Sequence, residues 1–574
     1  MKNDLSTDPS PYLQQHKNNP VDWQLWSKNT LKNAKFFKKP ILLSIGYASC
    51  HWCHVMAHES FEDLETAKLM NQYFINIKVD REERPDIDFV FQNCYQLFNR
   101  SGGGWPLTIF LDENAVPFMS GTYFPKIEQN GLPSFKDVLK KVGDIYKTQR
   151  TAIIKNSPII IKALELKKNP VINQDLISIL NLTINNLDEV NGGYKGSPKF
   201  PIYYVYETLL YFYNKTKEKN FLRPVSLILS KLCSQGIYDH VEGGVARYTV
   251  DDKWLVPHFE KMLYDNVQFI SILSKYLKIN SNKYFINKVE QTINYLRVNF
   301  TNHEGDGLLG SAYDADSEGV EGKYYIFTFD EIKKIENIEK YFEISPNGNW
   351  EGKIILKEKE LKTPPQNMIN SLNELRKNKK KPFFDNKSQL DLNCMWVNAL
   401  ISAHKVMPEG EYLMEAEKFF KKIEKKFSIS NLFHSNSKEI VFLEDYAYMI
   451  KTLIDLSEET LKARYRLCAQ ELTQDAINKF YHKEKNLFQK NPILSNDIFS
   501  EPLDVSDHTI PNGNSIMLMN FARLGLIKEG KILCDSLNGY LNIYKSSMSS
   551  TIKSIDYFNE VLLGKNCNDD GCEI

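Results

Sequence analysis

Two cysteines three residues apart, just after a strongly apolar run, constrain the fold of this chain more than any other feature. The pair is Cys50 and Cys53, and the apolar run Ile41–Gly46 ends shortly before it. The run predicts a buried strand, and the residues after Cys50 predict a helix whose first turn brings the two sulfurs within reach of a disulfide. Free N–H groups and a partial positive charge at a helix N-terminus lower a thiol pKa. The sequence therefore predicts an attacking thiolate at Cys50 and a resolving thiol at Cys53.

The segments after this pair follow the order of a thioredoxin-like fold. The expected elements are a strand at 74–80, a helix at 86–99, and strands at 107–112 and 116–123. Pro106 stands between a glycine run and a strand, which predicts a cis-proline beside the cysteines that shapes the substrate edge. A strand that leads into a CxxC pair is typical of thioredoxin-like proteins. We therefore expect an α/β thioredoxin-like domain over residues 1–165.

The histidines near the pair are candidates for tuning the two thiols. Ser44 stands six residues before Cys50, a position where thioredoxin often carries a buried acid. Without that acid, a local base would have to be a histidine, and a protonated His51 would further stabilise a Cys50 thiolate. The predicted catalytic set is Cys50, Cys53, His51, His54 and Pro106.

Other chemistries remain open for the same cluster. Cys50, Cys53, His54 and His58 are suitable zinc ligands, although one helical face cannot easily direct all four inward. Cys50-x-x-Cys53-His54 also matches the haem c attachment pattern, and the pair could simply be inert. We expect no metal and no cofactor.

From residue 174 onward the apolar residues recur at helical spacing. The expected helices are 174–188, 202–215, 222–236, 258–278, 282–300, 391–406, 412–427, 444–457, 459–482, 513–526, 528–541 and 550–563. An even number of helical hairpins predicts an all-α (α/α)6 toroid over 166–574, with a short β insertion near 321–360. A strand is expected at 323–329, and 351–387 is expected to be a surface excursion.

The loops of this second half hold the candidate binding residues. They are Glu242, Arg247, Tyr248, Trp254, His258, Glu260, Asp265, Asp314, Asp316, Glu444, Asp445 and His508. Aromatic rings and carboxylates suit a sugar, because rings stack on sugar faces and carboxylates accept from hydroxyls. Paired carboxylates can hydrolyse a glycosidic bond, and His258 or His508 can act as the acid or base of an epimerisation.

Several motifs in both halves resemble one family, the spermatogenesis-associated thioredoxin-domain proteins. They include Asn19–Trp23, Cys50–Met56, Val79–Asp86, Gly103–Thr108, Asp239–Tyr248, Trp254–Asp265 and Pro511–Ser515. The resemblance implies a thioredoxin-like domain fused to a six-hairpin glycosidase-like domain. Leu392 stands where the family motif has tryptophan, which weakens the expectation of sugar stacking. Cys567 and Cys572 resemble the terminal cysteine pair of the family, which implies a resolving pair that exchanges with Cys50 and Cys53.

Bulk properties limit the classes of function. A length of 574 residues indicates two or more domains. Lys+Arg and Asp+Glu both number 72, so no global field favours nucleic acid or an anionic membrane. The N-terminus has no apolar signal region and no apolar run reaches transmembrane length, so a cytoplasmic protein is expected.

The leading hypothesis is a thiol–disulfide redox protein fused to a toroid that binds or processes carbohydrate. Its expected partners are a protein thiol or disulfide and a sugar, with neither nucleic acid nor membrane. A first alternative is a sugar isomerase, epimerase or glycosidase with a structural thioredoxin-like lid. A second is a non-catalytic binding or chaperone-like protein.

Overall fold

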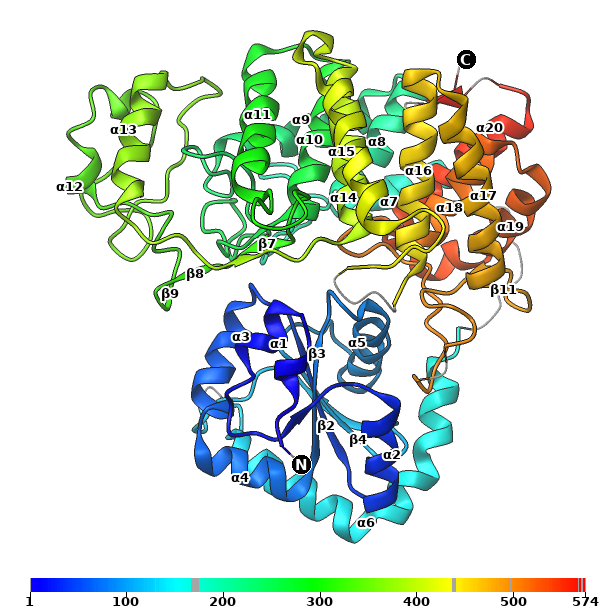
Figure 1. Ribbon diagram of the computed structural model, residues 1–574. Helices are drawn as coiled ribbons and strands as arrows, with labels where there is room; N and C mark the ends of the chain where they lie inside the picture. The colour runs from blue at the N-terminus through cyan, green and yellow to red at the C-terminus, as the bar shows by residue number, and fades with distance from the viewer. Residues whose placement is uncertain are drawn as a thin grey trace. The chain divides into compact units, whose positions relative to one another are not determined.

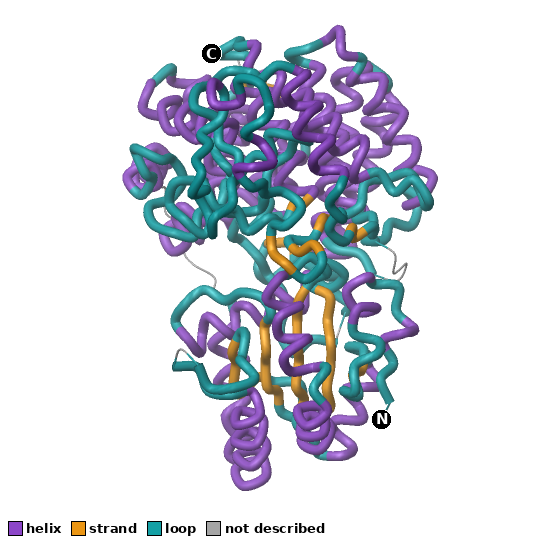
Figure 2. The backbone as a smooth tube through the Cα atoms, turned by 90° about the vertical axis from the view of Figure 1, so that its left-hand side faces the viewer, coloured by secondary structure: helices purple, strands orange, loops and turns teal. Residues whose placement is uncertain are grey.

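The chain folds into two compact units (Figure 1). The computed structural model describes residues 2–129, 131–166, 175–435, 440–495, 497–565, 567–568 and 571–572. The first unit comprises Met1–Lys167, Ser435–Ile440 and Gln489–Leu503, and the second comprises Lys168–His434, Val441–Phe488 and Asp504–Ile574. Strands are concentrated in the first unit and helices in the second (Figure 2).

A five-stranded mixed sheet forms the centre of the first unit. Its strands in spatial order are β1 (Trp23–Gln24), β3 (Ile75–Asp80), β2 (Ile41–Gly46), β4 (Leu107–Leu111) and β5 (Pro117–Gly121). β1, β3 and β2 run parallel, while β4 runs antiparallel to β2 and to β5. β2, β3 and β4 are buried along their whole lengths, as expected of strands covered on both faces. This is the predicted thioredoxin-like order.

Helices cover both faces of this sheet. They are α1 (Pro11–Gln15), α2 (Lys28–Phe37), α3 (His51–Met56), α4 (Leu64–Tyr73), α5 (Pro85–Asn99) and α6 (Phe135–Leu164). Their starts follow from local chemistry: Ser27 and Asp63 accept N-terminal N–H groups of α2 and α4, and proline opens α5. α3 continues into a π-helical turn at Ala57–Phe61.

Six inner helices form a closed ring in the second unit. They are α8 (Tyr203–Thr216), α10 (Leu263–Leu277), α14 (Leu390–His404), α16 (Leu443–Thr460), α18 (Gly513–Leu524) and α20 (Ser549–Leu562). Each contacts the next in this order, and α20 contacts α8. α14 is buried on nearly all sides, as expected of a helix that has neighbours all round.

Each inner helix has an outer partner. The outer helices are α7 (Leu176–Asn185), α9 (Lys219–Ser234), α11 (Lys283–Tyr295), α15 (Tyr412–Phe427), α17 (Ala463–Phe480) and α19 (Ile527–Tyr544). Consecutive helices pair as hairpins, and α7 packs against α20, so the first and last helices of the unit complete the sixth pair. The unit is the predicted (α/α)6 toroid. Within the described part of the chain, no helix is both long and apolar enough to cross a membrane.

Short strands accompany the loops of the toroid. A three-stranded sheet has the order β10 (Phe384–Asp385), β7 (Ala312–Tyr313), β6 (Lys261–Met262). Two-stranded pairs are β8 (Asp316–Ser317) with β9 (Val320–Glu321), β11 (Tyr481–His482) with β12 (Leu487–Phe488), and β13 (Cys567–Asn568) with β14 (Gly571–Cys572). Lys261 and Met262 occupy a region expected to be helical, and α10 begins only at Leu263.

The insertion between α11 and α14 differs from its prediction. The expected strand at 323–329 is absent: the segment makes turns and one isolated bridge, Phe327 to Ile354. A capping box between Thr328 and Glu331 instead starts α12 (Phe329–Ile332). The expected surface excursion also contains α13 (Gln366–Lys377), which packs into a small apolar core with Phe327 and Ile354.

Candidate functional site

The cysteine pair forms a disulfide at the start of α3. Cys50 is the N-cap of the helix, and its Sγ accepts a hydrogen bond from the backbone N–H of Cys53 at 3.2 Å. The two residues are disulfide-bonded with their Cα atoms 5.2 Å apart. Each is only 2% exposed, whereas Trp52 between them is 45% exposed. The two cysteines are therefore buried, whereas the predicted attacking thiolate was expected to be accessible.

The predicted proline lies at the same edge of the sheet as the disulfide. Ile45 at the end of β2 pairs with Leu107 at the start of β4, which places Pro106 beside the loop that leads to Cys50. The Trp105–Pro106 peptide bond is cis, as predicted. The Trp105 ring lies 5.8 Å from the Tyr47 ring, and the Arg81 guanidinium lies over both rings, 4.0 Å and 5.2 Å from their centroids. This geometry puts a permanent cation at the same edge of the sheet.

A buried lysine on β3 lies beside β2, the strand that leads to the disulfide. Lys78 Nζ donates a hydrogen bond to Ser44 Oγ at 3.0 Å, and the ammonium group faces the rings of Tyr12, Trp23 and Phe61. Burial lowers the pKa of Lys78 well below its usual value. Ser44 occupies the position where thioredoxin often carries a buried acid. Because Lys78 bonds this serine, its amine is a candidate local base in addition to the histidines. Sequence reasoning missed this lysine, because Lys78 lies in an alternating strand and lysines at such positions usually point to water.

The hydroxyl group of Tyr12 lies near the sulfur of Cys53. A Cβ atom added to Gly46 would lie 2.3 Å from Tyr12 Oη and 2.8 Å from Cys53 Sγ. Tyr12 Oη and Cys53 Sγ therefore both border the same small space beside Gly46. Tyr12 is fully buried, and its hydroxyl has no hydrogen-bond partner among the described residues. Burial, together with Asp80, raises the pKa of Tyr12 well above its ordinary value, so the group remains a donor. Glycine at position 46 is needed because any side chain would collide with these two groups.

The histidines of the predicted cluster do not converge on one point. His51 and His54 are half-buried, and the His51 ring lies 5.7 Å from that of Trp52. The side chain of His58 is 72% exposed and bonds Glu62 at 3.1 Å. With both sulfurs in a disulfide and His58 turned to solvent, the geometry does not form the zinc site considered from the sequence. The roles of His51 and His54 in tuning the thiols stay predictions.

Four of the predicted toroid residues form one network. Arg247 bonds Glu260 at 3.2 Å, His258 lies 3.3 Å from the same carboxylate, and the Tyr248 ring packs 4.9 Å from that of His258. His258 also bonds Glu321 through its other ring nitrogen. Sequence reasoning missed Glu321, which comes from β9 and is far from the others in the chain. The arrangement holds an imidazole between two carboxylates, which suits proton transfer.

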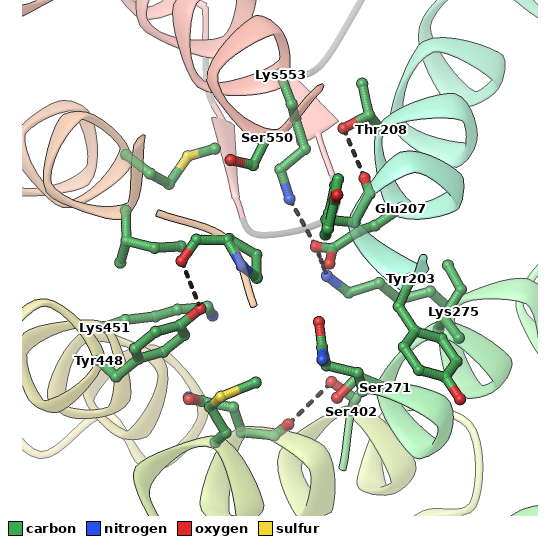
Figure 3. Close-up of a pocket in the computed structure, with 18 of the residues that line it drawn as sticks. Tyr203, Glu207, Thr208, Ser271, Lys275, Ser402, Tyr448, Lys451, Ser550 and Lys553 are labelled. Carbon is green, nitrogen blue, oxygen red and sulfur yellow. Dashed lines mark hydrogen bonds and ion pairs between the residues drawn. The ribbon is translucent and has the colours of Figure 1, made fainter. Parts of the chain in front are cut away.

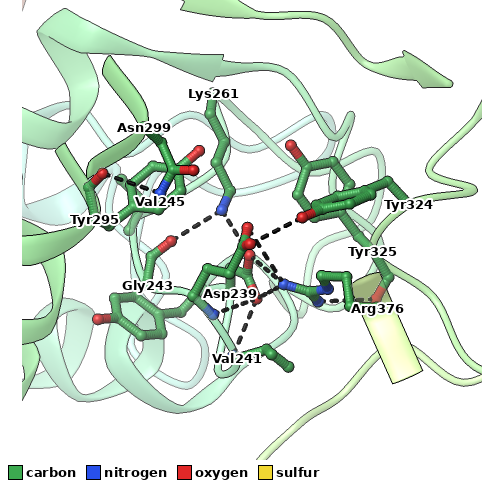
Figure 4. Close-up of polar contacts among 12 residues, drawn as sticks. Asp239, Val241, Gly243, Val245, Lys261, Tyr295, Asn299, Tyr324, Tyr325 and Arg376 are labelled. Carbon is green, nitrogen blue, oxygen red and sulfur yellow. Dashed lines mark hydrogen bonds and ion pairs between the residues drawn. The ribbon is translucent and has the colours of Figure 1, made fainter. Parts of the chain in front are cut away.

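Glu242 belongs to a second network, around Asp239 (Figure 4). Arg376 donates two hydrogen bonds of 2.8 Å to Asp239, and Lys261 donates one of 2.7 Å. Glu242 accepts from Tyr324 at 2.8 Å and lies 3.8 Å from Arg376. Burial raises the pKa of Asp239, but the two cations outweigh it and hold the pKa below its usual range. The charged groups of Asp239, Lys261 and Arg376 are all buried. Because Arg376 belongs to α13, its bonds to Asp239 join α13 to the toroid loops.

Other predicted residues have structural positions. Trp254 has no exposed surface, and its Nε1 donates to the carbonyl of Asn191 at 2.9 Å, so its ring packs in the core. Asp314 accepts the N–H of Asp316 in the turn before β8. His508 is 55% exposed at the side chain and lies 3.3 Å from Asp504. Asp265 is buried in the first turn of α10.

A buried cluster of metal-ligating side chains lies where α14 and α16 begin. Asp391, His434 and Asp445 each place one ligand atom within 4.8 Å of the others, and all three are buried. His434 Nδ1 bonds Asp445 at 2.8 Å, and Gln389 lies 3.3 Å from the other ring nitrogen. Burial and Asp445 raise the pKa of Asp391 to about 7, against the opposing effect of His434. The set can share a proton or hold a cation. Asp445 and neighbouring Glu444 were predicted as site residues, whereas Asp391 and His434 were not.

A cavity of about 80 Å³ lies on the axis of the toroid (Figure 3). Its polar lining includes Tyr203, Glu207, Thr208, Gln268, Ser271, Lys275, Asn398, Ser402, Tyr448, Lys451, Ser550 and Lys553. None of the predicted substrate residues lines it. They lie in loops and at helix starts, whereas most of the lining comes from within the inner helices. Charged residues within largely apolar helices were the available signal, and a single helix does not show that they face an axis.

The terminal cysteines can be described only by their backbone. Cys567 and Cys572 are Cα partners in the β13–β14 pair. Their predicted exchange with Cys50 and Cys53 concerns side chains, which lie outside the described structure. The free cysteines that the structure describes are Cys94, Cys233, Cys394, Cys468 and Cys534, of which all but Cys468 are buried.

Fold and site together define a class: a thioredoxin-like domain with a CxxC disulfide, joined to an (α/α)6 toroid. The sequence model of the family described as "Thioredox_DsbH: Protein of unknown function, DUF255" matches residues 2–165. A Caenorhabditis elegans relative, "Uncharacterized protein B0495.5", is 30% identical over 92% of this chain and 81% of its own length. Human "Spermatogenesis-associated protein 20" is 28% identical, over 91% of this chain and 76% of its own. The chain belongs to the family of spermatogenesis-associated protein 20.

Solved structures similar to the toroid have low sequence identity. A D-mannose isomerase is 14% identical with a TM-score of 0.43, over 68% of this chain and 97% of that one. The cellobiose 2-epimerase of Bacillus thermoamylovorans is 11% identical with a TM-score of 0.41, over 69% and 87%. The assignment of a closed helical ring in this chain rests on the contacts between its own helices.

Proposed function

We propose that the first unit carries out thiol–disulfide exchange with a protein or small-molecule disulfide. The observation that carries this proposal is the Cys50–Cys53 disulfide at the start of α3, at the sheet edge that also holds Pro106. A bonded CxxC pair at this place in a thioredoxin-like fold can accept two electrons as one reversible unit.

In the reducing direction, the Cys50 thiolate attacks one sulfur of a substrate disulfide. A Cys50–substrate bond forms, the substrate S–S bond breaks, and the other substrate sulfur leaves as a thiolate. Cys53, deprotonated, then attacks Cys50 Sγ, which restores the intramolecular disulfide and releases the second substrate thiolate. The Cys53 proton passes to a nearby base, for which buried Lys78 and the half-buried histidines are candidates. Because each cysteine is 2% exposed, the covering side chains must move before a protein disulfide can reach Cys50.

The proposal is tested by trapping the mixed disulfide. Reduced Cys53→Ser protein is treated with a small aromatic disulfide, whose coloured thiolate reports the reaction, and the adduct is located by mass spectrometry. We expect one stable adduct on Cys50, none at that position in Cys50→Ser, and wild-type turnover in Cys468→Ser, which removes a free cysteine of α17. Absence of a Cys50 adduct in Cys53→Ser would rule the exchange out.

A second candidate function is acid–base chemistry on a sugar in the toroid. It is favoured by His258, which lies between Glu260 and Glu321 beside Tyr248. In an isomerase or epimerase, one such group removes a proton from carbon and another returns it. Interconversion of aldose and ketose, followed by NMR in deuterated water, should proceed in Cys50→Ser/Cys53→Ser protein and stop in His258→Asn. Loss of turnover in the Cys50→Ser/Cys53→Ser protein would contradict the proposal that the toroid acts independently of the cysteine pair.

A further inference from the structure

The axial cavity of the toroid is lined by charged groups of mainly one sign. Lys275 comes from α10, Lys451 from α16 and Lys553 from α20, while Glu207 of α8 is the one acidic residue among its lining residues. Figure 3 shows these four side chains directed toward a common space from different inner helices. Their convergence results from closure of the ring and not from proximity in the sequence.

Two of the three lysines share a single carboxylate oxygen. Lys275 Nζ and Lys553 Nζ donate to Glu207 Oε1 at 2.7 Å and 2.6 Å. Lys275 and Lys553 are 14% and 13% exposed at their side chains, so water screens them only in part. One carboxylate neutralises one ammonium group, and the lining therefore holds more positive than negative charge.

The third lysine, Lys451, is held in position by Asp455, a residue that lies outside the lining of the cavity. Lys451 Nζ donates to Asp455 at 2.7 Å, and that carboxylate also accepts from Asn398 at 2.6 Å and pairs with Arg523 at 2.6 Å. Asp455 itself does not line the cavity. Arg523 also pairs with Glu458 at 2.6 Å, so two carboxylates balance Lys451 and Arg523, and Asp455 fixes the position of Lys451 at the axis. The excess of positive charge in the lining therefore comes from Lys275 and Lys553.

Charge excess in a partly dry cavity favours an anionic ligand. Separating ammonium groups from water is costly unless an opposite charge compensates them, and attraction between charges is stronger where the effective dielectric constant is low. The remaining lining offers hydroxyl and amide groups, including Ser271, Ser402 and Thr208, with the rings of Tyr203 and Tyr448 as walls. Such groups suit hydroxyls on the same ligand.

We propose that the axial cavity of the toroid is a binding site for a small hydroxylated anion, with a phosphate or carboxylate group held by Lys275, Lys451 and Lys553. The site is independent of thiol–disulfide exchange, which belongs to the other unit. It is also separate from the His258 network, none of whose members lines the cavity.

The proposal is tested on the full chain by titration calorimetry with glucose 6-phosphate, gluconate, inorganic phosphate and glucose. We expect glucose 6-phosphate or gluconate to bind at least tenfold more tightly than glucose, and inorganic phosphate to compete with the better ligand. A phosphate preference would identify a phosphorylated polyol, and a gluconate preference would identify a hydroxy acid. Equal heats for the neutral and the anionic sugars would overturn the proposal.

Two substitutions that change the charge of the lining in opposite directions distinguish binding at this site from general electrostatic attraction. Lys553→Met should weaken anion binding at least tenfold, whereas Glu207→Gln should tighten it severalfold, because two ammonium groups lose the carboxylate that they share. Lys531→Met, on the exposed face of α19, removes the same charge elsewhere and should leave the affinity unchanged. Weaker binding in Glu207→Gln, or equal losses in Lys553→Met and Lys531→Met, would contradict the site. Glu207→Gln keeps the test decisive if Lys553→Met does not fold.

Discussion

At the scale of single residues, the surroundings of Cys53 differ from what the sequence suggests. Histidines were the expected neighbours, but the structure places a buried phenol near the sulfur, and a buried amine on β3 that bonds Ser44 of the strand before the pair. A hydroxyl without a partner costs stability in the oxidised protein. Once the disulfide is reduced, the same hydroxyl can donate to Cys53 Sγ. Tyr12 is thus positioned to favour the reduced form.

Replacing Tyr12 by phenylalanine tests this role. The ring and its packing remain, so the oxidised protein should be as stable as wild type or slightly more stable. A hydrogen bond to a neutral group contributes about 0.5–1.5 kcal/mol, so the equilibrium constant for reduction by glutathione should fall about two- to tenfold. Redox titration read by alkylation measures this constant. An unchanged constant would show that Tyr12 Oη does not bond Cys53 Sγ in the reduced protein.

Asp391 provides a pH-dependent prediction at the same scale. Burial and Asp445 raise its folded-state pKa to about 7, above its value in an unfolded chain, so the folded protein binds a proton more tightly. Stability should therefore fall as pH rises from about 4 to about 7. Asp391→Asn should be more stable than wild type at pH 8, by up to about 4 kcal/mol, with the difference shrinking toward pH 4.

The measurement is the thermal midpoint of both proteins across this pH range. Asp252→Asn, at an exposed loop position, is the matched control and should track wild type at every pH. Loss of stability in Asp391→Asn at pH 8 would mean that the carboxylate is needed in its charged form, as a bound cation would require.

At the scale of elements, regular segments were predictable and the insertion was not. The inner helices and the strands of the first unit carry their own apolar periodicity, which depends only on local sequence. α13 lies in a Lys- and Asn-rich stretch that reads as surface. Its burial depends on Arg376 meeting Asp239, more than a hundred residues earlier, and no local pattern encodes that pair. The axial lysines escaped prediction for the same reason, since only ring closure brings them together.

The contribution of α13 can be measured through Arg376. Arg376→Met keeps much of the side-chain volume but leaves buried Asp239 with Lys261 as its remaining cation partner of the network. Breaking a buried ion pair from one side costs about 3 kcal/mol. A lower thermal midpoint is therefore expected, while Lys377→Met, at the exposed neighbouring position of the same helix, should have no effect. Equal midpoints for the two variants would show that α13 is held by apolar contacts alone.

At the scale of the whole molecule, the first compact unit is not one continuous stretch of chain. Gln489–Leu503 belongs to it although the sequence suggested a single boundary near residue 165. Arg84 bonds both Asp86 and Asp497 at 2.8 Å, and the Phe499 ring packs 5.9 Å from that of Phe91 on α5. A late segment of the chain thereby completes the core of the thioredoxin-like unit.

The effect of this segment should appear as local stability of α5. Phe499→Ala removes the ring that packs on Phe91, so amide hydrogens of α5 should exchange faster, while those of α2 remain unchanged. Ile493→Ala, at an exposed position of the same segment, is the control. Equal protection of α5 in both variants would show that the thioredoxin-like unit does not depend on Phe499.

Thiol–disulfide exchange in this protein requires that Cys50 becomes a reactive thiolate when the disulfide is reduced. The most direct measurement is the rate of iodoacetamide alkylation of each cysteine in the fully reduced protein, resolved by mass spectrometry from pH 5 to pH 9. Cys468, a free and half-buried cysteine whose pKa is raised by burial, is the internal reference. We predict that Cys50 reacts at least tenfold faster than Cys468 at pH 7, with a midpoint below the ordinary thiol value of about 8.5. A Cys50 that reacts no faster than Cys468, or whose midpoint lies at or above that value, would contradict the account.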